Sequence, residues 1–233
     1  MVQCIYVKSI IEKLTFFFQR QNNENNSEYL YKIINDYKQK RPVYEEFRNV
    51  VHGAVEAVLK NNHYKYQISS RTKAIERLEE KIIRKKNDNK YYTSISDIED
   101  LVGIRVIFYT EKDKNRFIDE IKEELSGSIK IEEKNKTNGY NAIHLIVSFG
   151  DKRLKLSEYK HFKGLKSEIQ LTSIFHHAWA EIEHDLIYKD IYGLKQSDPE
   201  KYFLIKDRMN NLSEKYIKTA ASEMEEIMDI IKQ

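Results

Sequence analysis

The chain has 233 residues, enough for one domain with a sizeable core, and its 2 prolines and 7 glycines argue against a flexible string of small domains. Its 40 basic and 37 acidic residues leave a formal net charge of +3, which is too small to mark a general nucleic-acid binder, so any basic patch must be local. The single cysteine, Cys4, excludes internal disulfides, and we see neither a signal peptide nor an apolar run of membrane-spanning length, so we expect a cytoplasmic protein.

The first 62 residues are predicted to be mostly helical. Residues 1–20 alternate apolar and basic groups, and the polar tract at 21–27 has the composition of a linker. From Tyr29 to about Asn62 apolar residues recur at three- and four-residue spacing, and Pro42 suits a first helical turn. The residues expected on the buried side of this helix are Tyr44, Phe47, Val51, Val55 and Val58.

Helices and strands alternate in the rest of the chain. After a short extended stretch at 64–70, Ser70 is placed to cap a helix over residues 71–86 that buries three apolar side chains, Ile75, Leu78 and Ile82. The later predicted elements are strands at 104–109, 129–134, 143–149 and 165–171, a helix at 112–125, a helix that Thr172 or Ser173 caps and that holds Trp179, and a last helical region that Pro199 opens. This alternation predicts an α/β fold, with a central β-sheet flanked by helices.

Two carboxylates occur where the predicted strands would place them at a cleft. Asp100 lies where a loop enters a strand, and a metal that bridges nucleotide phosphates needs one or two such carboxylate ligands. Glu168 and Gln170 share one face of a strand, while Ile169 and Leu171 occupy the other face. A strand with this pattern inside an otherwise buried sheet predicts a polar cleft.

The loop before residue 143 has features of a nucleotide-binding loop. Gly139 permits a turn with positive φ, and the ring of Tyr140 then offers a flat surface on which a base can stack, worth about 1–3 kcal/mol. Lys136 is placed to meet a phosphate. On the predicted helix at 71–86, Arg77, Lys81 and Lys85 follow i, i+4, i+8 and share one face, although such a basic face is usually just solvated.

Four stretches in this order resemble the synthetase domain of the RelA/SpoT family, over roughly residues 64–190. The chain reads D-L-V-G-I-R from Asp100, K-T-N-G-Y-N-A-I-H from Lys136, S-E-I-Q-L-T from Ser167 and H-H-A-W-A-E-I-E-H-D-L-I-Y-K from His176. The family patterns are D-x-x-G-[IV]-R, N-G-Y-x-S-[IL]-H, E-[IV]-Q-I-R-T and W-A-x-x-E-H-x-x-x-Y-K. The resemblance implies a nucleotidyltransferase-like fold with a mixed sheet. It also implies transfer of the β,γ-pyrophosphate of ATP to the 3′-hydroxyl of GDP or GTP, which yields (p)ppGpp and AMP.

The resemblance also assigns roles to individual residues. It makes Asp100 the Mg²⁺ ligand, and it makes Glu168 the general base for the acceptor hydroxyl or a further metal ligand. The pattern R-x-K-x-x-x-S-x-x-x-K assigns ATP binding to Arg71, Lys73 and Lys81, together with Arg105. The residues that it assigns to the acceptor are Lys136, Asn138, Tyr140, His144 and Gln170.

Several positions depart from the family patterns. Asn141 and Ala142 replace an arginine and a serine, Thr172 replaces an arginine, and Arg77 replaces a serine. These changes predict intact transfer chemistry with altered surroundings for the acceptor. We expect GDP or GTP as acceptor; the alternative is a toxic small synthetase that pyrophosphorylates the 3′-CCA end of tRNA. That acceptor would need a basic surface, for which 38–41 and 84–86 are the candidates.

Two other classes of function stay open at this point. One is a non-catalytic nucleotide- or RNA-binding module on a decayed scaffold. The other is a metal-carboxylate oxidase, because His177, Glu181 and His184 are spaced i, i+4, i+7, and the pattern Glu-x-x-His occurs at both Glu181 and Glu158. No H-E-x-x-H is present, and we expect Trp179 and the histidines to pack their helix against the sheet instead.

The predicted organisation has three parts: an N-terminal segment and linker at 1–28, a synthetase domain at 29–190 and a C-terminal helical extension at 191–233 that packs on the same domain. No hydrolase part is evident ahead of residue 64, so the chain resembles the small single-domain synthetases. The expected partners are ATP, the acceptor, and a second copy of the chain or an antitoxin.

Overall fold

The structure is a computed structural model that describes residues 2–125, 129–135, 141–190 and 192–232. These residues fall into two compact units. The first unit comprises Met1–Pro42 and Lys73–Ile98, and the second comprises Val43–Thr72 and Glu99–Gln233. None of the described helices is both long enough and apolar enough to cross a membrane.

The first unit contains the N-terminal part of helix α1 (Val2–Asn61), helix α2 (Ile75–Asn87) and the short turn η1 (Ile95–Asp97). Two tyrosines of α1 hold the segments on either side of α2. The hydroxyl of Tyr37 donates to the carbonyl of Lys73 at 2.6 Å, and the hydroxyl of Tyr29 accepts from the backbone N–H of Tyr92 at 2.8 Å. Leu78 and Ile82 of α2 are buried as predicted.

Helix α1 differs from its prediction in two respects. The backbone stays helical through the tract at 21–27 that we predicted as a linker, because a helix propagates through polar residues once it is nucleated. Pro42 lies inside α1 rather than in its first turn, so that prediction was wrong. An internal proline costs about 3 kcal/mol, but Tyr37 before it and Phe47 after it are fully buried, and their burial keeps the helix continuous. The three-part division of the chain stays a prediction.

The second unit is built on a five-stranded sheet in the order β1-β2-β5-β4-β3. Strands β2 and β5 run parallel, and the other three neighbouring pairs are antiparallel. The predicted mixed α/β fold is therefore confirmed, and each of the four later strands lies within two residues of its predicted bounds. The strands are β1 (Tyr66–Thr72), β2 (Val102–Phe108), β3 (Ile129–Asn135), β4 (Asn141–Val147) and β5 (Ser167–Ser173).

The prediction that Ser70 caps a helix containing Arg71 was wrong. Both residues belong to β1, where Ser70 pairs with Ile104 and Arg71 pairs with Gly103. The strand continues to Thr72 because the whole length of β2 is available to pair with it. Helix α2 then starts only at Ile75.

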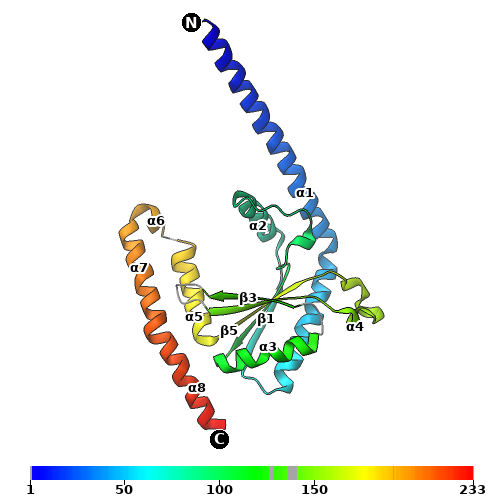
Figure 1. The fold of residues 1–233 in the computed structure, drawn as a ribbon, viewed down its shortest axis with the longest axis vertical. Coiled ribbons are helices and arrows are strands. Elements are labelled where there is room, and N and C mark those ends of the chain that lie inside the picture. The colour runs from blue at the N-terminus through cyan, green and yellow to red at the C-terminus, as the bar shows by residue number, and fades with distance from the viewer. Residues whose placement is uncertain (1, 126–128, 136–140, 191, 233) are drawn as a thin grey trace. The chain divides into compact units, whose positions relative to one another are not determined.

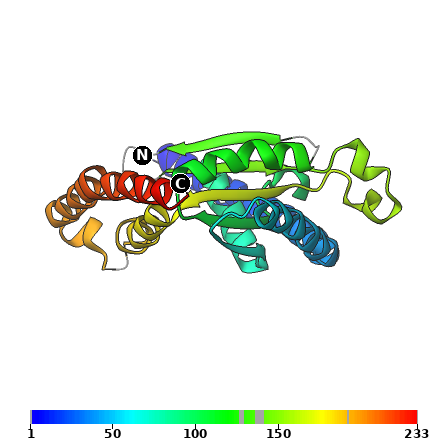
Figure 2. The same cartoon turned by 90° about the horizontal axis from the view of Figure 1, so that it is seen from below.

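Helices α3 (Glu111–Leu125) and α5 (Ile174–Glu183) both contact β2 and β5. Figure 1 shows α3 in front of the strands, and Figure 2 shows the same helix along one side of the sheet. The remaining helical elements are α4 (Asp151–Leu154), η2 (Ser157–Phe162), η3 (His184–Tyr188), α6 (Leu194–Ser197), α7 (Pro199–Leu212), η4 (Ser213–Ile217) and α8 (Lys218–Lys232).

The core of the second unit lies between the sheet and its helices. The ring of Phe117 from α3 packs on Phe108 of β2 with centroids 5.3 Å apart, and both rings are fully buried. A second aromatic contact joins Phe47 of α1 to Phe162 at 5.3 Å. The side chains predicted to face the core from the helix at 29–62 are all buried: Tyr44, Phe47, Val51, Val55 and Val58.

Candidate functional site

Polar side chains gather on one face of the sheet. The strand register places Arg71, Gly103 and Glu168 in one row across β1, β2 and β5. The next row contains Arg105 and Gln170. Because alternate residues of a strand point to the same face, both rows face the same side, and a cavity of about 350 Å³ opens there. Its lining residues are Ser69, Ser70, Arg71, Asp100, Gly103, Ile104, Arg105, Glu168 and Gln170.

Gly103 forms part of the cavity floor. It lies between Arg71 and Glu168 in the row, and a Cβ atom at this position would lie 3.8 Å from Cγ of Arg71. That is an ordinary contact distance, so the backbone itself tolerates a side chain here. The glycine of the D-x-x-G-[IV]-R pattern therefore keeps the cavity open rather than relieving strain.

Glu168 is held by hydrogen bonds to both of its carboxylate oxygens. Nδ1 of His144 lies 2.8 Å from Oε1, and Nε2 of Gln170 donates to Oε2 at 2.7 Å. Burial raises the pKa of Glu168, but the hydrogen bond and charge of His144 and the hydrogen bond from Gln170 outweigh it, so this pKa lies below its usual range. The carboxylate is therefore fixed in place and ionised at neutral pH.

Asp100 faces the same cavity from the start of β2, as the sequence predicted. Its negative charge opposes the ionisation of Glu168, which partly offsets the lowering of the Glu168 pKa by His144 and Gln170. Two carboxylates that repel each other beside an open cavity suit a hard cation such as Mg²⁺, which typically takes one or two protein carboxylates and completes its shell with water and phosphate oxygens. In the described part of the chain, no group of three or more His, Cys, Asp or Glu residues is placed to hold a metal.

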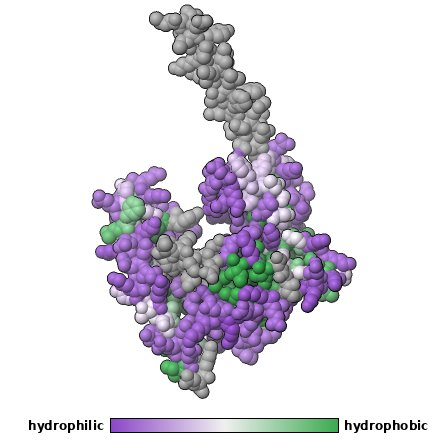
Figure 3. Space-filling model, viewed as in Figure 1, coloured by the Kyte–Doolittle hydropathy of each residue, from purple (hydrophilic) through white to green (hydrophobic). Residues whose placement is uncertain are grey.

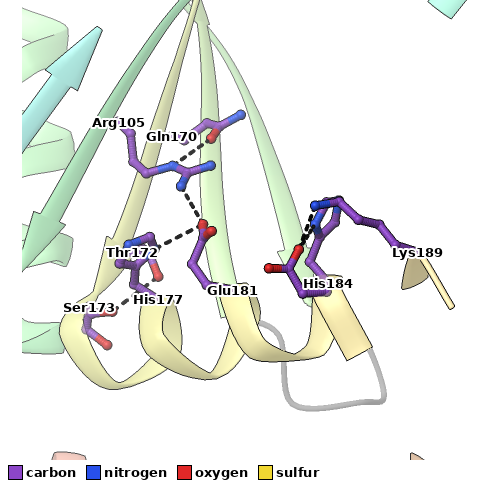
Figure 4. Close-up of polar contacts among 9 residues, drawn as sticks. Arg105, Gln170, Thr172, Ser173, His177, Glu181, His184 and Lys189 are labelled. Atoms are coloured by element: carbon purple, nitrogen blue, oxygen red, sulfur yellow. Dashed lines mark hydrogen bonds and ion pairs between the residues drawn. The ribbon is translucent and has the colours of Figure 1, made fainter. Parts of the chain in front are cut away.

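Arg105 connects the cavity to helix α5. Its Nε donates to Oε1 of Gln170 at 3.3 Å, and its Nη1 donates to Oε1 of Glu181 at 2.7 Å (Figure 4). The imidazole of His177 also faces Glu181, with Nδ1 3.7 Å from Oε1. Burial and the charge of Arg105 lower the pKa of His177, which favours its neutral form. Two acceptors on different elements thus orient one guanidinium group.

Sequence reasoning missed the role of Glu181. Its spacing with His177 and His184 suggested a metal site, whereas its carboxylate pairs with Arg105, 76 residues away in the chain. No local sequence pattern predicts a contact between residues so far apart in the chain. Helix α5 contacts the sheet as predicted and Trp179 is buried, but Nε1 of Trp179 donates to the carbonyl of Met209 in α7 at 3.1 Å, and His184 is exposed.

A second, smaller cavity of about 30 Å³ adjoins Arg105 and Gln170. Ala142 and Thr172 line it, and these are two of the positions where the chain departs from the family patterns. The wall that separates the two cavities is formed by Arg105 and Gln170, which line both.

The remaining predicted site residues belong to three different parts of the chain. Lys73 and Lys81 belong to the first unit, where Nζ of Lys81 lies 5.9 Å from the ring centroid of Tyr92. His144 lies on β4 and contacts Glu168, as described above. Lys136, Asn138 and Tyr140 lie outside the described residues.

Comparisons with known proteins agree with this architecture. A curated relative, GTP pyrophosphokinase YwaC from Bacillus subtilis (strain 168), is 29% identical over 124 residues, which make up 52% of this chain and 57% of the relative. The alignment thus spans little more than half the length of that relative.

Solved structures share the fold. The small alarmone synthetase 1 from Bacillus subtilis bound to its product pppGpp has a TM-score of 0.67 and 20% identity, over 85% of this chain and 100% of that one. The same synthetase bound to AMPCPP has a TM-score of 0.59 and 19% identity, over 85% and 98%. Residues 70–192 match the family described as the region found in RelA/SpoT proteins, and the chain belongs to this family.

Proposed function

We propose that this chain is a pyrophosphokinase that transfers the β,γ-pyrophosphate of ATP to a ribose 3′-hydroxyl. The observation that carries the proposal is the cavity in which two carboxylates, Asp100 and Glu168, lie with two arginines, Arg71 and Arg105. Positioning and charge stabilisation dominate the catalysis of phosphoryl-type transfers, and this set of groups supplies both. The name of the curated relative and the ligands of the two solved neighbours support the same chemistry.

The arginines suit the donor nucleotide. Guanidinium groups bind phosphate oxygens with two hydrogen bonds and stack on purine rings, and Arg71 and Arg105 reach the cavity from adjacent strands. Arg105 is already oriented by Gln170 and Glu181, so less freedom is lost when a nucleotide binds. The assignment of Lys73 and Lys81 to ATP rests on the motif spacing alone.

Asp100 and Glu168 would hold Mg²⁺. When bound, the ion supplies positive charge that neutralises the phosphates of the donor. The mutual repulsion of the two carboxylates, which appears as the effect of Asp100 on the pKa of Glu168, would be relieved by a bound cation.

The reaction needs a group that receives the proton of the acceptor hydroxyl. In the proposed step the 3′-oxygen forms a bond to the β-phosphorus, the bond between that phosphorus and the α–β bridging oxygen breaks, and AMP leaves with this oxygen. Where Glu168 acts as the base rather than as a metal ligand, it receives the hydroxyl proton, and its lowered pKa keeps it ionised at neutral pH. His144 and Gln170 hold its two oxygens and thereby aim it.

GDP or GTP is the acceptor that we favour, since Lys136, Tyr140 and His144 match the family positions to which the resemblance assigns the acceptor. A tRNA 3′ end is the second candidate, because Ala142 and Thr172 provide no cation at the small cavity. The deciding experiment incubates the chain and Mg²⁺ with β/γ-labelled ATP and, in parallel, GDP, GTP and bulk tRNA. We expect labelled guanosine 3′-diphosphates and AMP. Label on tRNA alone would replace our first choice of acceptor, and label on neither would favour a non-catalytic binding module.

A further inference from the structure

Helix α5 lacks the local features that usually hold the start of a helix in place. It comprises only the 10 residues Ile174–Glu183, and a helix of this length is marginal without tertiary contacts. Ser173 occupies its N-cap position, but in the described part of the chain this side chain makes no capping hydrogen bond. The first turn also contains no acidic residue that would favour a helix start. The position of α5 must therefore come from contacts with other elements.

A buried histidine supplies one such contact. Nδ1 of His176, in the first turn of α5, lies 3.1 Å from Oε1 of Glu111 in α3 and 2.9 Å from Oγ of Ser173. The side chains of His176 and Ser173 are both buried. Glu111 is ionised at neutral pH, and an ionised carboxylate can only accept, so Nδ1 of His176 must carry the hydrogen. A hydrogen bond to a charged group thus joins the first turn of α5 to α3.

The first turn of α3 is a firm partner for this contact. Glu111 also forms an ion pair with Lys114, which is buried although the exposed residues of α3 are all polar and Figure 3 shows hydrophilic surface over this helix. From the side of α8, Glu225 accepts from the backbone N–H of Lys112 at 3.0 Å, and Asp229 pairs with Nζ of Lys112 at 2.5 Å. Glu111 therefore lies in a turn that other contacts already fix.

Another side of α5 faces the candidate site. Successive residues of a helix point about 100° apart, so His176 turns toward α3 while His177 turns toward the cavity. Figure 4 shows His177 and Glu181 on the side of α5 that faces Arg105. Glu181 lies only about 7.5 Å along the helix axis from His176. A shift of the first turn would therefore displace both residues that contact the guanidinium group or its partner.

We propose that His176 is a positioning residue for the nucleotide site. Its hydrogen bond to Glu111 fixes the first turn of α5 and thereby holds Glu181 where it orients Arg105. The step from Arg105 to a nucleotide rests on the proposed function, whereas the step from His176 to Arg105 rests on the contacts alone. The two steps need separate tests.

The first test is an NMR titration of His177 in the full chain. Burial and the charge of Arg105 lower the pKa of His177 below its ordinary value of 6.5, and they outweigh the opposite effect of Glu181. His176→Leu removes the hydrogen bond at a similar volume, so the pKa of His177 should rise toward 6.5. His176→Asn places an N–H group close to the position of Nδ1 and should keep the wild-type value.

Tyr64→Phe is the matched control on the same helix. The hydroxyl of Tyr64 donates to Glu120 and accepts from Arg116, both of α3, at 2.8 Å each. Its loss should lower the free energy of unfolding without changing the pKa of His177. A wild-type pKa of His177 in His176→Leu overturns the proposal, as does an equal rise in Tyr64→Phe or in His176→Asn. His176→Phe takes the place of the leucine variant if that variant does not fold.

The second test measures the Kd of a non-hydrolysable ATP analogue by titration calorimetry. Because the effect passes through Glu181, His176→Leu should raise the Kd by no more than Glu181→Ala does, which is at most about fivefold. In a Glu181→Ala background it should add nothing. An equal loss in both backgrounds overturns the positioning role. A wild-type chain that does not bind the analogue contradicts the proposed function, and the titration of His177 then decides the role of His176.

Discussion

Glu181 contributes to the candidate site through Arg105. The carboxylate and the guanidinium are both partly exposed, with side chains 57% and 37% accessible, so this ion pair contributes little to the stability of the fold. Its value lies in orientation, because Gln170 and Glu181 together define the plane of the guanidinium group. A residue at an unspecified position of one motif thus orients the arginine of another motif.

Replacing Glu181 should therefore weaken nucleotide binding. We predict that Glu181→Ala raises the Kd of a non-hydrolysable ATP analogue about three- to fivefold, in line with the roughly 0.2–1 kcal/mol of an exposed ion pair. Titration calorimetry measures the change. Asp185→Ala is the matched control, because Asp185 forms a similar exposed pair with Lys189 at 2.6 Å.

The effects of Glu181→Ala and Arg105→Ala on nucleotide binding should also be coupled. In an Arg105→Ala background, Glu181→Ala should cause no further loss, because the group that it orients is gone. An equal loss in both backgrounds would mean that Glu181 acts on the nucleotide directly or through the fold.

The two cavity carboxylates give the sharpest test of the chemistry. Asp100→Asn and Glu168→Gln should each abolish AMP release from ATP while circular dichroism reports an unchanged fold. Glu158→Gln should keep full activity, since Glu158 is exposed and lies outside the cavity. If either cavity variant stays within about tenfold of the wild-type rate, roughly 1.4 kcal/mol of barrier, its assigned role is wrong.

At the scale of elements, a buried charged cluster joins α3 to the junction of β5 and α5. Glu111 at the start of α3 forms an ion pair with the buried Lys114, and its Oε1 lies 3.1 Å from Nδ1 of His176. Burial alone would raise the pKa of Glu111. The hydrogen bond from His176 and the charge of Lys114 outweigh that effect and lower the pKa to about 2. This carboxylate favours the folded state while it is ionised.

The stability of the fold should therefore fall at acid pH in a predictable window. The folded-state pKa of Glu111 lies below its ordinary value of 4.5, so its contribution is fully present above pH 4.5 and is lost as the pH drops toward 2. The shift corresponds to a free energy of unfolding on the order of 3 kcal/mol. Urea unfolding of Glu111→Gln at pH 7 should show a loss of that order and a flatter pH dependence below pH 5.

An exposed ion pair provides the control for the urea unfolding of Glu111→Gln. Glu214 pairs with Lys218 on the exposed side of the C-terminal segment, so Glu214→Gln should change the unfolding free energy by less than about 0.5 kcal/mol. Similar losses in the two variants would indicate that Glu111 has no special role.

At the scale of the whole molecule, nucleotide binding should increase the free energy of unfolding. A ligand that binds only the folded chain stabilises it by about 2.7 kcal/mol at 100 times its Kd. We expect a non-hydrolysable ATP analogue with Mg²⁺ to raise the thermal midpoint of the wild-type chain, and Arg71→Ala to reduce that increase. A full increase in the variant would remove Arg71 from the donor site.

Sequence periodicity was a good guide to elements with strong local signals. The apolar runs of β2, β4 and β5 and the three- and four-residue spacing of α1 led to correct strands, a correct helix and a correct set of buried residues. The pairing of Asp100 with Glu168 in one cavity also followed from motif positions at strand ends.

The errors arose where tertiary structure outweighed local preference. The polar run Ser69-Ser70-Arg71 has no strand signal of its own and becomes extended because β2 pairs with it. The contact of Arg105 with Glu181 depends on how α5 packs against the sheet, which no short spacing encodes. Both misses concern residues whose conformation is decided by a partner far away in the chain.

The strand order has a consequence for how the protein folds during its synthesis. Strand β2 lies beside β5, which follows it by about 60 residues, so the row containing Gly103 and Glu168 closes only after Ser173 has been synthesised. Contacts between residues so distant in sequence form late, because a long loop must be closed first. A nascent chain would thus contain Arg71 and Arg105 well before Glu168 is synthesised. If the proposed function holds, ATP turnover would begin only once synthesis of the sheet is complete.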